Sequence, residues 1–322
     1  MVSRDGGRKA ALICGSVAYD TILLFPDRFK QHILPDKLHI LNVSFLVPEM
    51  RREFGGCAAN IAYTLHLLGD TALPMAAAGH DFGPYRERLA ARGISVEHIK
   101  IIDEAFTAQA FITTDLDDNQ ITAFHPGAMQ YAHLNRVGDA GGKVALGIVA
   151  PDGRQAMIEH AAQFAAAGIP FIFDPGQGLP MFSGPELEKF IEQASWVAVN
   201  DYEWGMLAQK TGLTMAEVAG RVEALIVTRG AEGSVVHAGG RVWEIPCAKP
   251  RALVDPTGCG DAYRAGLIHG LLHSLDWQTS GRLASLLGAI KIESRGPQNH
   301  AFTREELLRR YSENFGQAPE GI

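Results

Sequence analysis

The 322-residue chain alternates continuous apolar runs with segments in which apolar residues recur at helical spacing. A run that is apolar throughout, rather than at every second position, predicts a strand buried on both faces of a sheet. Alternation of such strands with helices predicts an α/β fold whose mostly parallel sheet is covered by helices on both faces. The expected strands span residues 11–17, 71–78, 96–102, 144–150, 170–174, 196–200 and 224–228, and an antiparallel pair spans 234–237 and 242–245.

Helices are expected between these strands because apolar residues there repeat every three or four positions. A helix opened by Gly55–Asn60 ends at Gly69, since glycine readily adopts the left-handed conformation of a helix C-terminus. A second helix begins within the glycine-rich stretch Gly258–Asp261. The other predicted helices span residues 82–91, 154–167, 185–194, 202–210, 283–293 and 303–311.

Two segments interrupt this alternation. Residues 27–54 contain prolines and β-forming residues but no helical period, which predicts short strands outside the main sheet. Residues 105–124 have the pattern of a β-hairpin whose turn includes Asp117–Asn119. We expect both insertions to pair as one small sheet, a lid over the ligand site of the main domain. The predicted domains are a main α/β domain of residues 1–26, 55–104 and 126–322 and a β lid of residues 27–54 and 105–125.

Composition describes an ordinary globular protein with a large core, at 47% hydrophobic and 20% charged residues. The net charge of −7 argues against a nucleic-acid partner or an anionic membrane surface. No stretch reaches the roughly 20 apolar residues that a membrane span needs. A basic segment precedes the apolar run Ala10–Ala18, as in a signal peptide, but Gly15 and Ser16 break that run, which fits a first strand better. We therefore expect a cytoplasmic protein.

Neither the cysteines nor the histidines have the spacing of a strong metal site. The cysteines form no C-x-x-C pair, which predicts buried thiols in a reducing compartment. His269 and His273 are four residues apart on a predicted helix, but neither an H-E-x-x-H motif nor a nearby third ligand accompanies them. The sequence therefore disfavours a metal at this pair. The cysteines are Cys14, Cys57, Cys247 and Cys259.

The stretch Asp255–Asp261 has the clearest chemical pattern. Its glycines open a predicted helix, whose first turn presents unpaired backbone N–H groups and the positive end of the helix dipole. Small residues there let an anion approach the backbone, and Asp261 would stand beside that anion with its carboxylate free to take a proton. This arrangement suits phosphoryl transfer to an alcohol. Alternatively, the same residues are an ordinary helix start with an acidic first turn.

Other polar residues also follow predicted strands. Since ligands bind at the carboxyl ends of parallel strands, we expect these residues to converge. Neither G-x-x-x-x-G-K-[ST] nor a strand-linked G-x-G-x-x-G is present, which argues against P-loop NTPases and Rossmann dehydrogenases. The residues expected to converge are Asp20, Asn200, Arg229 and Asp261.

Two of these motifs together resemble the signature regions of the ribokinase-like (PfkB) family of small-molecule kinases. They are Gly55-Gly56-x-x-x-Asn60 and Asp255-x-Thr257-Gly258-x-Gly260-Asp261. The resemblance runs from Ala11 to about Leu308. Further blocks resemble the microbial broad-specificity nucleoside kinases, relatives of adenosine kinase. These blocks are residues 118–122, 173–177, 227–235, 245–247 and 255–266.

The resemblance implies a three-layer α/β/α fold with a mostly parallel central sheet and a small β-sheet lid. It also implies an ATP- and Mg²⁺-dependent kinase of purine salvage. Such an enzyme phosphorylates the 5′-hydroxyl of a nucleoside of the adenosine, inosine or cytidine type to the 5′-monophosphate. The main domain would then bind both the nucleotide and the nucleoside.

Roles at the nucleoside follow from the resemblance residue by residue. Asp20 matches the carboxylate that grips the ribose hydroxyls. Gly56 and Asn60 match residues that line the same sugar site. Gln120 and Phe124, on the predicted lid hairpin, would lie near the substrate.

Roles at the phosphates follow in the same way. Asn200 and Glu203 match an N-x-x-E element that organises Mg²⁺ and the phosphates through water. Asp261 matches the catalytic base, and we expect its carboxylate beside a helix N-terminus to have a low pKa. Asp255 matches part of a monovalent-cation site, which extends the expected cofactors to K⁺. The matched nucleotide-binding residues are Thr228, Arg229, Gly230 and Gly233, and the matched anion hole is Thr257, Gly258, Cys259 and Gly260.

Some positions depart from the family pattern. Ala18 stands where ribokinases carry an asparagine that contacts the sugar, which weakens a plain ribose specificity. Cys259 replaces an alanine of the anion hole, and we expect an inert structural thiol there. The alternatives are a sugar kinase of the ribokinase or fructokinase type and a non-catalytic nucleoside sensor. The intact Asp261 motif argues against the sensor, and an exposed lid sheet favours pairing into a homodimer.

Overall fold

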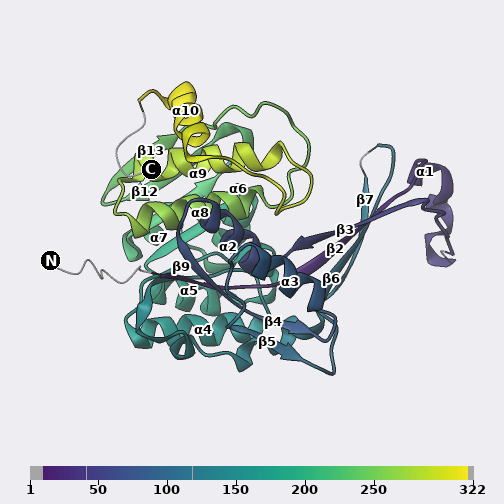
Figure 1. The fold of residues 1–322 in the computed structure, drawn as a ribbon, viewed down its shortest axis with the longest axis horizontal. Coiled ribbons are helices and arrows are strands. Elements are labelled where there is room, and N and C mark those ends of the chain that lie inside the picture. Colours follow the sequence, from purple (N-terminus) through teal and green to yellow (C-terminus); the bar gives the residue numbers. More distant parts are fainter. Residues whose placement is uncertain (1–9, 41, 118, 318–322) are drawn as a thin grey trace.

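The computed structural model describes residues 10–317 except 41 and 118, and they form two sheets (Figure 1). The central sheet has nine strands in the order β13-β12-β11-β10-β9-β8-β1-β4-β5. Strands β11 to β5 of this order pair in parallel, and β12 and β13 add an antiparallel edge. The strands are β1 (Ala10–Cys14), β4 (Thr71–Gly79), β5 (Ile99–Ile102), β8 (Val144–Val149), β9 (Phe171–Phe173), β10 (Trp196–Asn200), β11 (Ala224–Thr228), β12 (Ser234–Ala238) and β13 (Arg241–Ile245).

Helices cover both faces of this sheet, as predicted. Alternate side chains of β1 enter two different cores, Ala11 and Ile13 on one face and Leu12 and Cys14 on the other. One face carries α2 (Cys57–Leu67), α3 (Gly83–Ala91), α8 (Cys259–Leu272) and α9 (Trp277–Ile292), with α10 (Arg304–Phe315) packed outside α9. The other face carries α4 (Arg154–Ala167), α5 (Gly184–Gln193), α6 (Asp201–Thr211) and α7 (Met215–Arg221).

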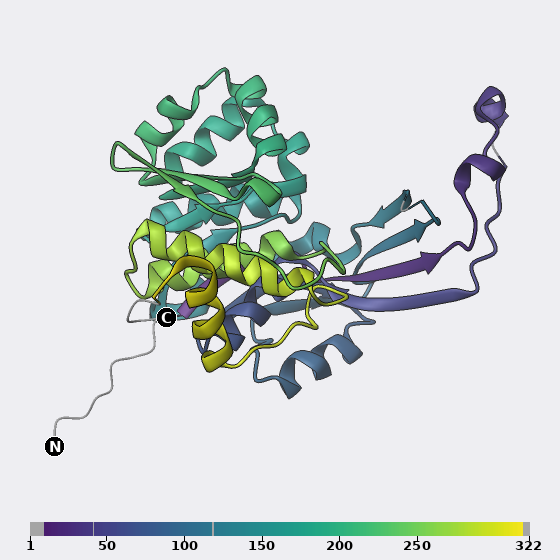
Figure 2. The same ribbon diagram turned by 90° about the horizontal axis from the view of Figure 1, so that it is seen from above.

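The second sheet has four strands and projects from the main body (Figures 1 and 2). Its order is β3-β2-β6-β7, so the two predicted insertions meet in one small sheet. The predicted turn residue Asp118 lies outside the described residues. The strands are β2 (Ala18–Leu24), β3 (Glu49–Gly55), β6 (Ala108–Thr114) and β7 (Gln120–His125).

The small sheet differs from its prediction in two respects. The first predicted strand ends at Cys14, and the chain then joins the small sheet at Ala18 instead of staying in the main domain. The described residues of the segment 27–54 contain one strand, β3, instead of several. They also include helix α1 (Phe29–His32) and a 3₁₀ turn, and Phe29 stacks on Phe25, just before the segment, with ring centroids 5.8 Å apart.

Short 3₁₀ segments and one longer helix complete the description. Helix α9 begins at Trp277, earlier than predicted, because Asp276 caps it by accepting a 3.0 Å bond from the Thr279 N–H. Of the helices in the described ranges, none is both long enough and apolar enough to cross a membrane. The 3₁₀ segments are η1 (Pro35–Ile40), η2 (Gly127–Leu134), η3 (Val137–Lys143), η4 (Gly176–Met181) and η5 (Gly230–Glu232).

Close packing of α8 on α9 depends on glycines. An added Cβ at Gly266 would overlap the backbone of Ala284, and one at Gly270 would overlap the side chain of Ser280. We therefore expect Gly266→Ala to lower the free energy of unfolding by about 1–3 kcal/mol, the usual cost of overpacking. Its control is Gly205→Ala in α6, where the Cβ meets open space and helix propensity improves by up to about 1 kcal/mol. Urea denaturation of both variants checks this, and equal effects would contradict it.

Candidate active site

The N-terminus of α8 has the geometry of an anion site. Gly258 caps the helix in the left-handed conformation (φ 83°), and a Cβ there would stand 2.7 Å from Pro297. The Cys259 amide donates to the carbonyl of Pro256 at 3.1 Å. The next amides, of Gly260 and Asp261, have no acceptor within the part of the chain that the structure describes. Such amides at a helix N-terminus suit a phosphate oxygen.

Asp261 lies against a residue from the other end of the chain. The side-chain amide of Asn60 donates to its carboxylate at 2.8 Å, across 201 residues of sequence. Asn60 reaches this position because Gly56, whose φ is 93°, is the N-cap of α2 and sets the direction in which the helix starts. A Cβ at Gly56 would press on the backbone of residues 16–18, so glycine is required for the close approach of α2 to the chain after β1.

Two residues without any sequence signal fix the orientation of Asn60. Gln298, which is buried, donates to Oδ1 of Asn60 at 2.9 Å and to the hydroxyl of Tyr85 at 2.6 Å. That hydroxyl donates in turn to the carbonyl of Gly55 at 2.7 Å. Because Oδ1 accepts from Gln298, the amide nitrogen of Asn60 is directed at Asp261. Gln298 and Tyr85 therefore position the group that holds the carboxylate.

The ionisation of Asp261 differs from the prediction. Burial raises the pKa of its carboxyl to about 7, and the charge of Asp174 adds to this effect. The bond from Asn60 and the charge of Arg264 act in the opposite direction. The expected low pKa was wrong because loss of water around the carboxylate outweighs the effect of the helix terminus. The carboxyl therefore titrates near neutral pH.

A buried ion pair stands beside Asp261. Arg264, one turn further along α8, donates to both oxygens of Asp174 at 3.1 Å, and each side chain is at most 7% exposed. Asp174 follows β9, so the pair ties α8 to the carboxyl end of the central sheet. Asp174 also holds the pKa of Arg264 above its ordinary range despite burial. Both residues lie in segments that resemble the nucleoside kinases, but the resemblance implied no role for either.

Asn200 and Glu203 cap the start of α6 at the end of β10. The Asn200 side chain accepts from the amide of Glu203 at 2.7 Å, and the Glu203 carboxylate accepts from the backbone and side chain of Asn200 at 2.8 and 2.9 Å. Burial raises the pKa of Glu203, and the negative charge of Asp174 raises it further. Two carboxylates thus crowd adjacent strand ends, an arrangement that favours a bound cation.

Asp20 reaches the site from the small sheet. It lies within β2, opposite Glu53 of β3, and not directly after a strand of the central sheet, so the predicted placement of this residue at a central strand end was wrong. A Cβ at Gly55 would stand 2.5 Å from its carboxylate, so glycine leaves room for Asp20. Burial, Asp255 and Glu53 raise the pKa of Asp20 to about 6.

Some other predicted residues make no hydrogen bond to Asp261 or Asn60 among the described residues. Arg229 bonds to Glu244 of β13 at 2.6 Å, and Thr228 bonds only weakly to the carbonyl of Val199, at 3.5 Å. Gly230 and Gly233, both with positive φ, bound the short turn η5 that follows β11. Gln120 and Phe124 are exposed on β7, Phe124 to 52%.

The two remaining residues of the anion loop are accounted for. The amide of Thr257 donates to the Asp255 carboxylate at 2.9 Å, which shapes the turn before α8. Burial raises the pKa of the Cys259 thiol to about 11, as an inert thiol requires. This high pKa agrees with the expected structural thiol, since the thiolate is the reactive form.

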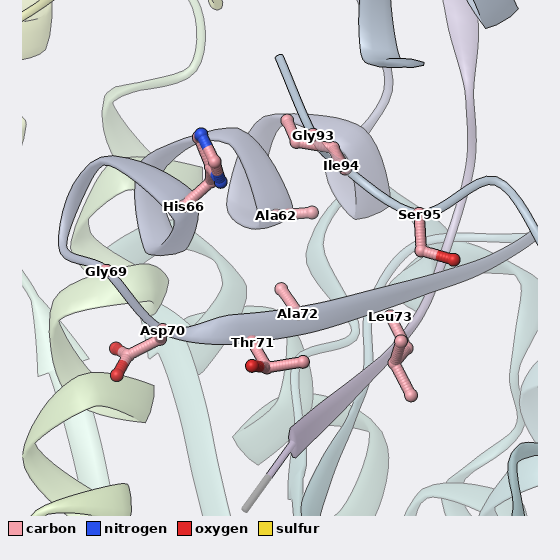
Figure 3. Close-up of a pocket in the computed structure, with 10 residues that line it drawn as sticks. All are labelled: Ala62, His66, Gly69, Asp70, Thr71, Ala72, Leu73, Gly93, Ile94 and Ser95. Atoms are coloured by element: carbon pink, nitrogen blue, oxygen red, sulfur yellow. The ribbon is translucent and has the colours of Figure 1, made fainter. Parts of the chain in front are cut away.

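A cavity of about 350 Å³ lies outside this site, between the end of α2 and the start of β4 (Figure 3). Asp70, on its wall, accepts from His269 at 2.7 Å and from His273 at 2.8 Å. The expectation that this pair lacks a third ligand was wrong, because the three side chains bring their ligand atoms within 4.8 Å. The Asp70 carboxylate is hydrogen-bonded directly to both imidazole rings, so these bonds connect the C-terminal end of α8 to the turn after α2.

The buried pair predicts a large asymmetry between two charge deletions. Asp174→Asn leaves the Arg264 guanidinium buried without its partner, and we expect a loss of about 3–5 kcal/mol in unfolding free energy. The matched control is Glu188→Gln, which removes an exposed pair with Arg221 at 3.2 Å and is expected to cost less than about 1 kcal/mol. Guanidinium denaturation measures both, and a similar cost for the two would refute the assignment.

Known proteins resemble this chain along nearly all of its length. The nucleoside kinase of Methanothermobacter thermautotrophicus is 31% identical and covers 96% of this chain and 97% of its own. The structure of the Methanocaldococcus jannaschii nucleoside kinase, an archaeal member of the ribokinase family, is 28% identical with a TM-score of 0.87 over 95% of this chain and 99% of that one. The structure of the Burkholderia thailandensis nucleoside kinase in complex with inosine is 51% identical, with a TM-score of 0.88 over 97% of this chain and 100% of that one.

A second structure of the Burkholderia thailandensis kinase, in complex with ADP-inosine, is 52% identical with a TM-score of 0.86 over 97% of this chain and 98% of that one. These neighbours confirm the ribokinase-like architecture of a three-layer main body with a small sheet. The family described as pfkB family carbohydrate kinase matches residues 25–304, which is most of the chain. The chain belongs to the PfkB family of carbohydrate kinases.

Proposed function

We propose that the protein is a nucleoside kinase that transfers the γ-phosphoryl group of ATP to the 5′-hydroxyl of a nucleoside of the adenosine, inosine or cytidine type. The Asn60–Asp261 bond at the N-terminus of α8 carries the proposal, because it sets a half-buried carboxylate beside free backbone amides. The similarity to a kinase whose structures contain inosine and ADP-inosine supports the choice of substrates. A protein that only sensed nucleosides would not need this arrangement.

Asp261 acts as the base in this proposal. As the 5′-oxygen bonds to the γ-phosphorus, the bond from that phosphorus to the ADP oxygen breaks, and the 5′-hydroxyl proton passes to the Asp261 carboxylate. Asn60 holds the carboxylate in place and favours its charged form. The amides of Gly260 and Asp261 stabilise the charge on the phosphoryl oxygens.

The acidic residues at the strand ends fit a divalent cation. Glu203 and Asp174 place two carboxylates near each other, and their mutual repulsion is only partly offset by Arg264. Bound Mg²⁺ would neutralise phosphate charge and align the phosphates. Glu203 and Asn200 would hold it through water, as the resemblance implies. The capping bonds between Asn200 and Glu203 keep this pair at the start of α6.

Asp20 is the proposed ligand of the ribose hydroxyls. Its carboxylate is half-buried and accepts no protein hydrogen bond among the described residues, so it can accept hydroxyl donors from a sugar. The sugar site would then be shared between β2 and the start of α2, where Gly56 and Asn60 lie. Gln120 and Phe124 of β7 stay proposals for side chains that cover the substrate.

Asp261→Asn tests the base. We expect kcat to fall by about 10²–10⁴-fold, the usual contribution of a positioned base, while ATP and nucleoside still bind. The same variant should melt at a higher temperature at pH 8. The folded pKa of Asp261, about 7, lies above its ordinary value of 3.8, so ionisation between these values destabilises the folded state. Near-normal turnover would contradict the assignment.

The pH profile gives an independent prediction. Because the base must be ionised, kcat/KM should rise with pH and level off above about 7. Asn60→Ala removes a bond that lowers the pKa of Asp261, so the midpoint of the kcat/KM profile of this variant should move to higher pH. Its kcat/KM should also be lower at every pH. Initial rates between pH 5.5 and 9 in both proteins measure this. A profile that keeps its midpoint in Asn60→Ala would show that Asn60 does not act on the base.

An ADP-release assay tests the function itself. The purified protein with ATP and Mg²⁺ is offered inosine, adenosine, cytidine, ribose and fructose in parallel, with Asp261→Asn as the matched control. We expect release with nucleosides and formation of the 5′-monophosphate, identified by chromatography. Release with sugars alone would support the sugar-kinase alternative, and binding of nucleosides without release would support the sensor.

The predicted homodimer is supported by the exposed surface of the small sheet. Its strands expose several apolar side chains, a pattern expected of a surface covered by a second copy. Light scattering of the purified protein measures the mass. The exposed side chains are Leu24 (38%), Met50 (70%), Phe111 (41%) and Ile121 (44%).

A further inference from the structure

Lys291, near the end of α9, is fully buried directly behind the anion loop. Its exposure is 0%, and it is the one lysine among the buried polar residues of the described chain. Its ammonium donates to the carbonyl of Asp255 at 2.7 Å and to that of Ser294 at 3.0 Å. A Cβ at Gly258 would stand 3.7 Å from Cε of Lys291, so the lysine lies against the helix start that faces the phosphate.

The surroundings of this ammonium are those of a bound cation. Backbone carbonyls are the groups with which proteins replace the hydration shell of K⁺. None of the ion pairs among the described residues includes Lys291. Both carboxylate oxygens of Asp255 accept from amides instead, those of Thr257 and Gly296. Burial lowers the pKa of Lys291, while the negative fields of Asp255 and Glu53 favour its charged form.

The resemblance implied that K⁺ binds beside Asp255 and nearby carbonyls, and the residues present do not fit that ion. The carbonyls of Asp255 and Ser294 already accept from the ammonium. A second positive charge on the same oxygens would stand next to the first in a buried space, where like charges repel strongly. The predicted K⁺ site is therefore filled by a side chain.

We propose that the ammonium of Lys291 is a built-in monovalent cation, which holds the anion loop against the end of α9 and lets the enzyme work without K⁺. The same two segments are joined by bonds from the amides of Val254 and Asp255 to the carbonyl of Ile292, at 2.9 and 3.0 Å. The ammonium also adds positive charge behind the amides that would bind the transferred phosphoryl group. The effect on turnover rests on the proposed kinase function.

The wild-type protein provides the first test. Phosphorylation of inosine is measured in KCl, NaCl and choline chloride at one ionic strength of about 0.1 M, where screening is the same for all three salts. We expect the three rates to agree within a factor of about two, a difference of about 0.4 kcal/mol at most. Strong activation by K⁺ over choline would overturn the proposal. If no nucleoside is phosphorylated in any salt, the proposed function has failed, and the stability test below decides the cation separately.

Two variants give the second test. In choline chloride, both Lys291→Ala and Lys291→Met should lose about 10²-fold in kcat, the scale of losing one stabilising group of an oxyanion site. Lys291→Ala opens a space lined by the freed carbonyls, so K⁺ should restore most of its activity. Lys291→Met fills that space with an uncharged chain of similar length, so K⁺ should restore none. Full activity of Lys291→Ala without K⁺ would refute the proposal. A folded Lys291→Ala whose kcat does not change when K⁺ is added would refute it as well.

Melting temperature is the readout that does not need activity. A ligand that binds only the folded state raises it, so KCl against choline chloride should stabilise Lys291→Ala and leave the wild type and Lys291→Met unchanged. Lys210→Ala is the matched control, because Lys210 also donates to carbonyls, those of Leu179, Pro180 and Phe182, at the far end of α6 from Asn200. It should destabilise the protein without any response to K⁺. Equal K⁺ responses in Lys291→Ala and Lys210→Ala would overturn the proposal.

Discussion

The hydrogen bond from Asn60 to Asp261 requires two helices from distant parts of the sequence to begin at the same place. Gly56 allows α2 to start against the chain after β1, and Gly258 allows α8 to start against Pro297. Gln298 then fixes the amide of Asn60 between the two helices. Gly56, Gly258 and Gln298, from three separate parts of the chain, thus hold this one contact at 2.8 Å.

The same contact lies in a region where burial and charge oppose each other. Burial raises the pKa of Asp261 to about 7 and that of Asp20 to about 6, so the site holds carboxyl groups that ionise less readily than ordinary ones. Two buried side chains of the protein, Arg264 and Lys291, place positive charge in this region. Such a site is less stable than an apolar core would be, and its groups gain their best partners only when phosphates, hydroxyls and a divalent cation are bound.

Much of the main domain could be predicted because its signals are local. Continuous apolar runs mark the parallel strands, and the glycines before Asp261 mark the start of α8. Gln298 and Tyr85 could not be found in this way, since their roles depend on contacts between segments more than 200 residues apart. Lys291 did leave a signal, because Leu287 and Ala284, four and seven residues earlier on the same helix face, are apolar and buried.

The errors have physical causes of the same kind. Asp20 was placed after a central strand because the break at Gly15 and Ser16 gives no indication of which sheet the next strand joins. The low pKa expected for Asp261 came from its place in the helix, whereas burial in the folded protein decides its ionisation. In both cases the local sequence pattern was recognised correctly, but contacts with distant parts of the chain determined the outcome.

The first excursion of the chain into the small sheet has a consequence for how this protein can diversify. The chain leaves the main body near Ser16 and returns at Gly56, and the returning amides of Cys57 and Ala58 bond to Ser16 at 3.2 and 3.0 Å. Asp20 lies close to this closed base, whereas the far end of the excursion bonds to the second insertion, through the Phe29 amide and the Asp115 carboxylate at 2.9 Å. A change at the far end therefore has to be matched in the second insertion, but it leaves the bonds at the base intact, so new substrate preferences can arise there without rebuilding the catalytic centre.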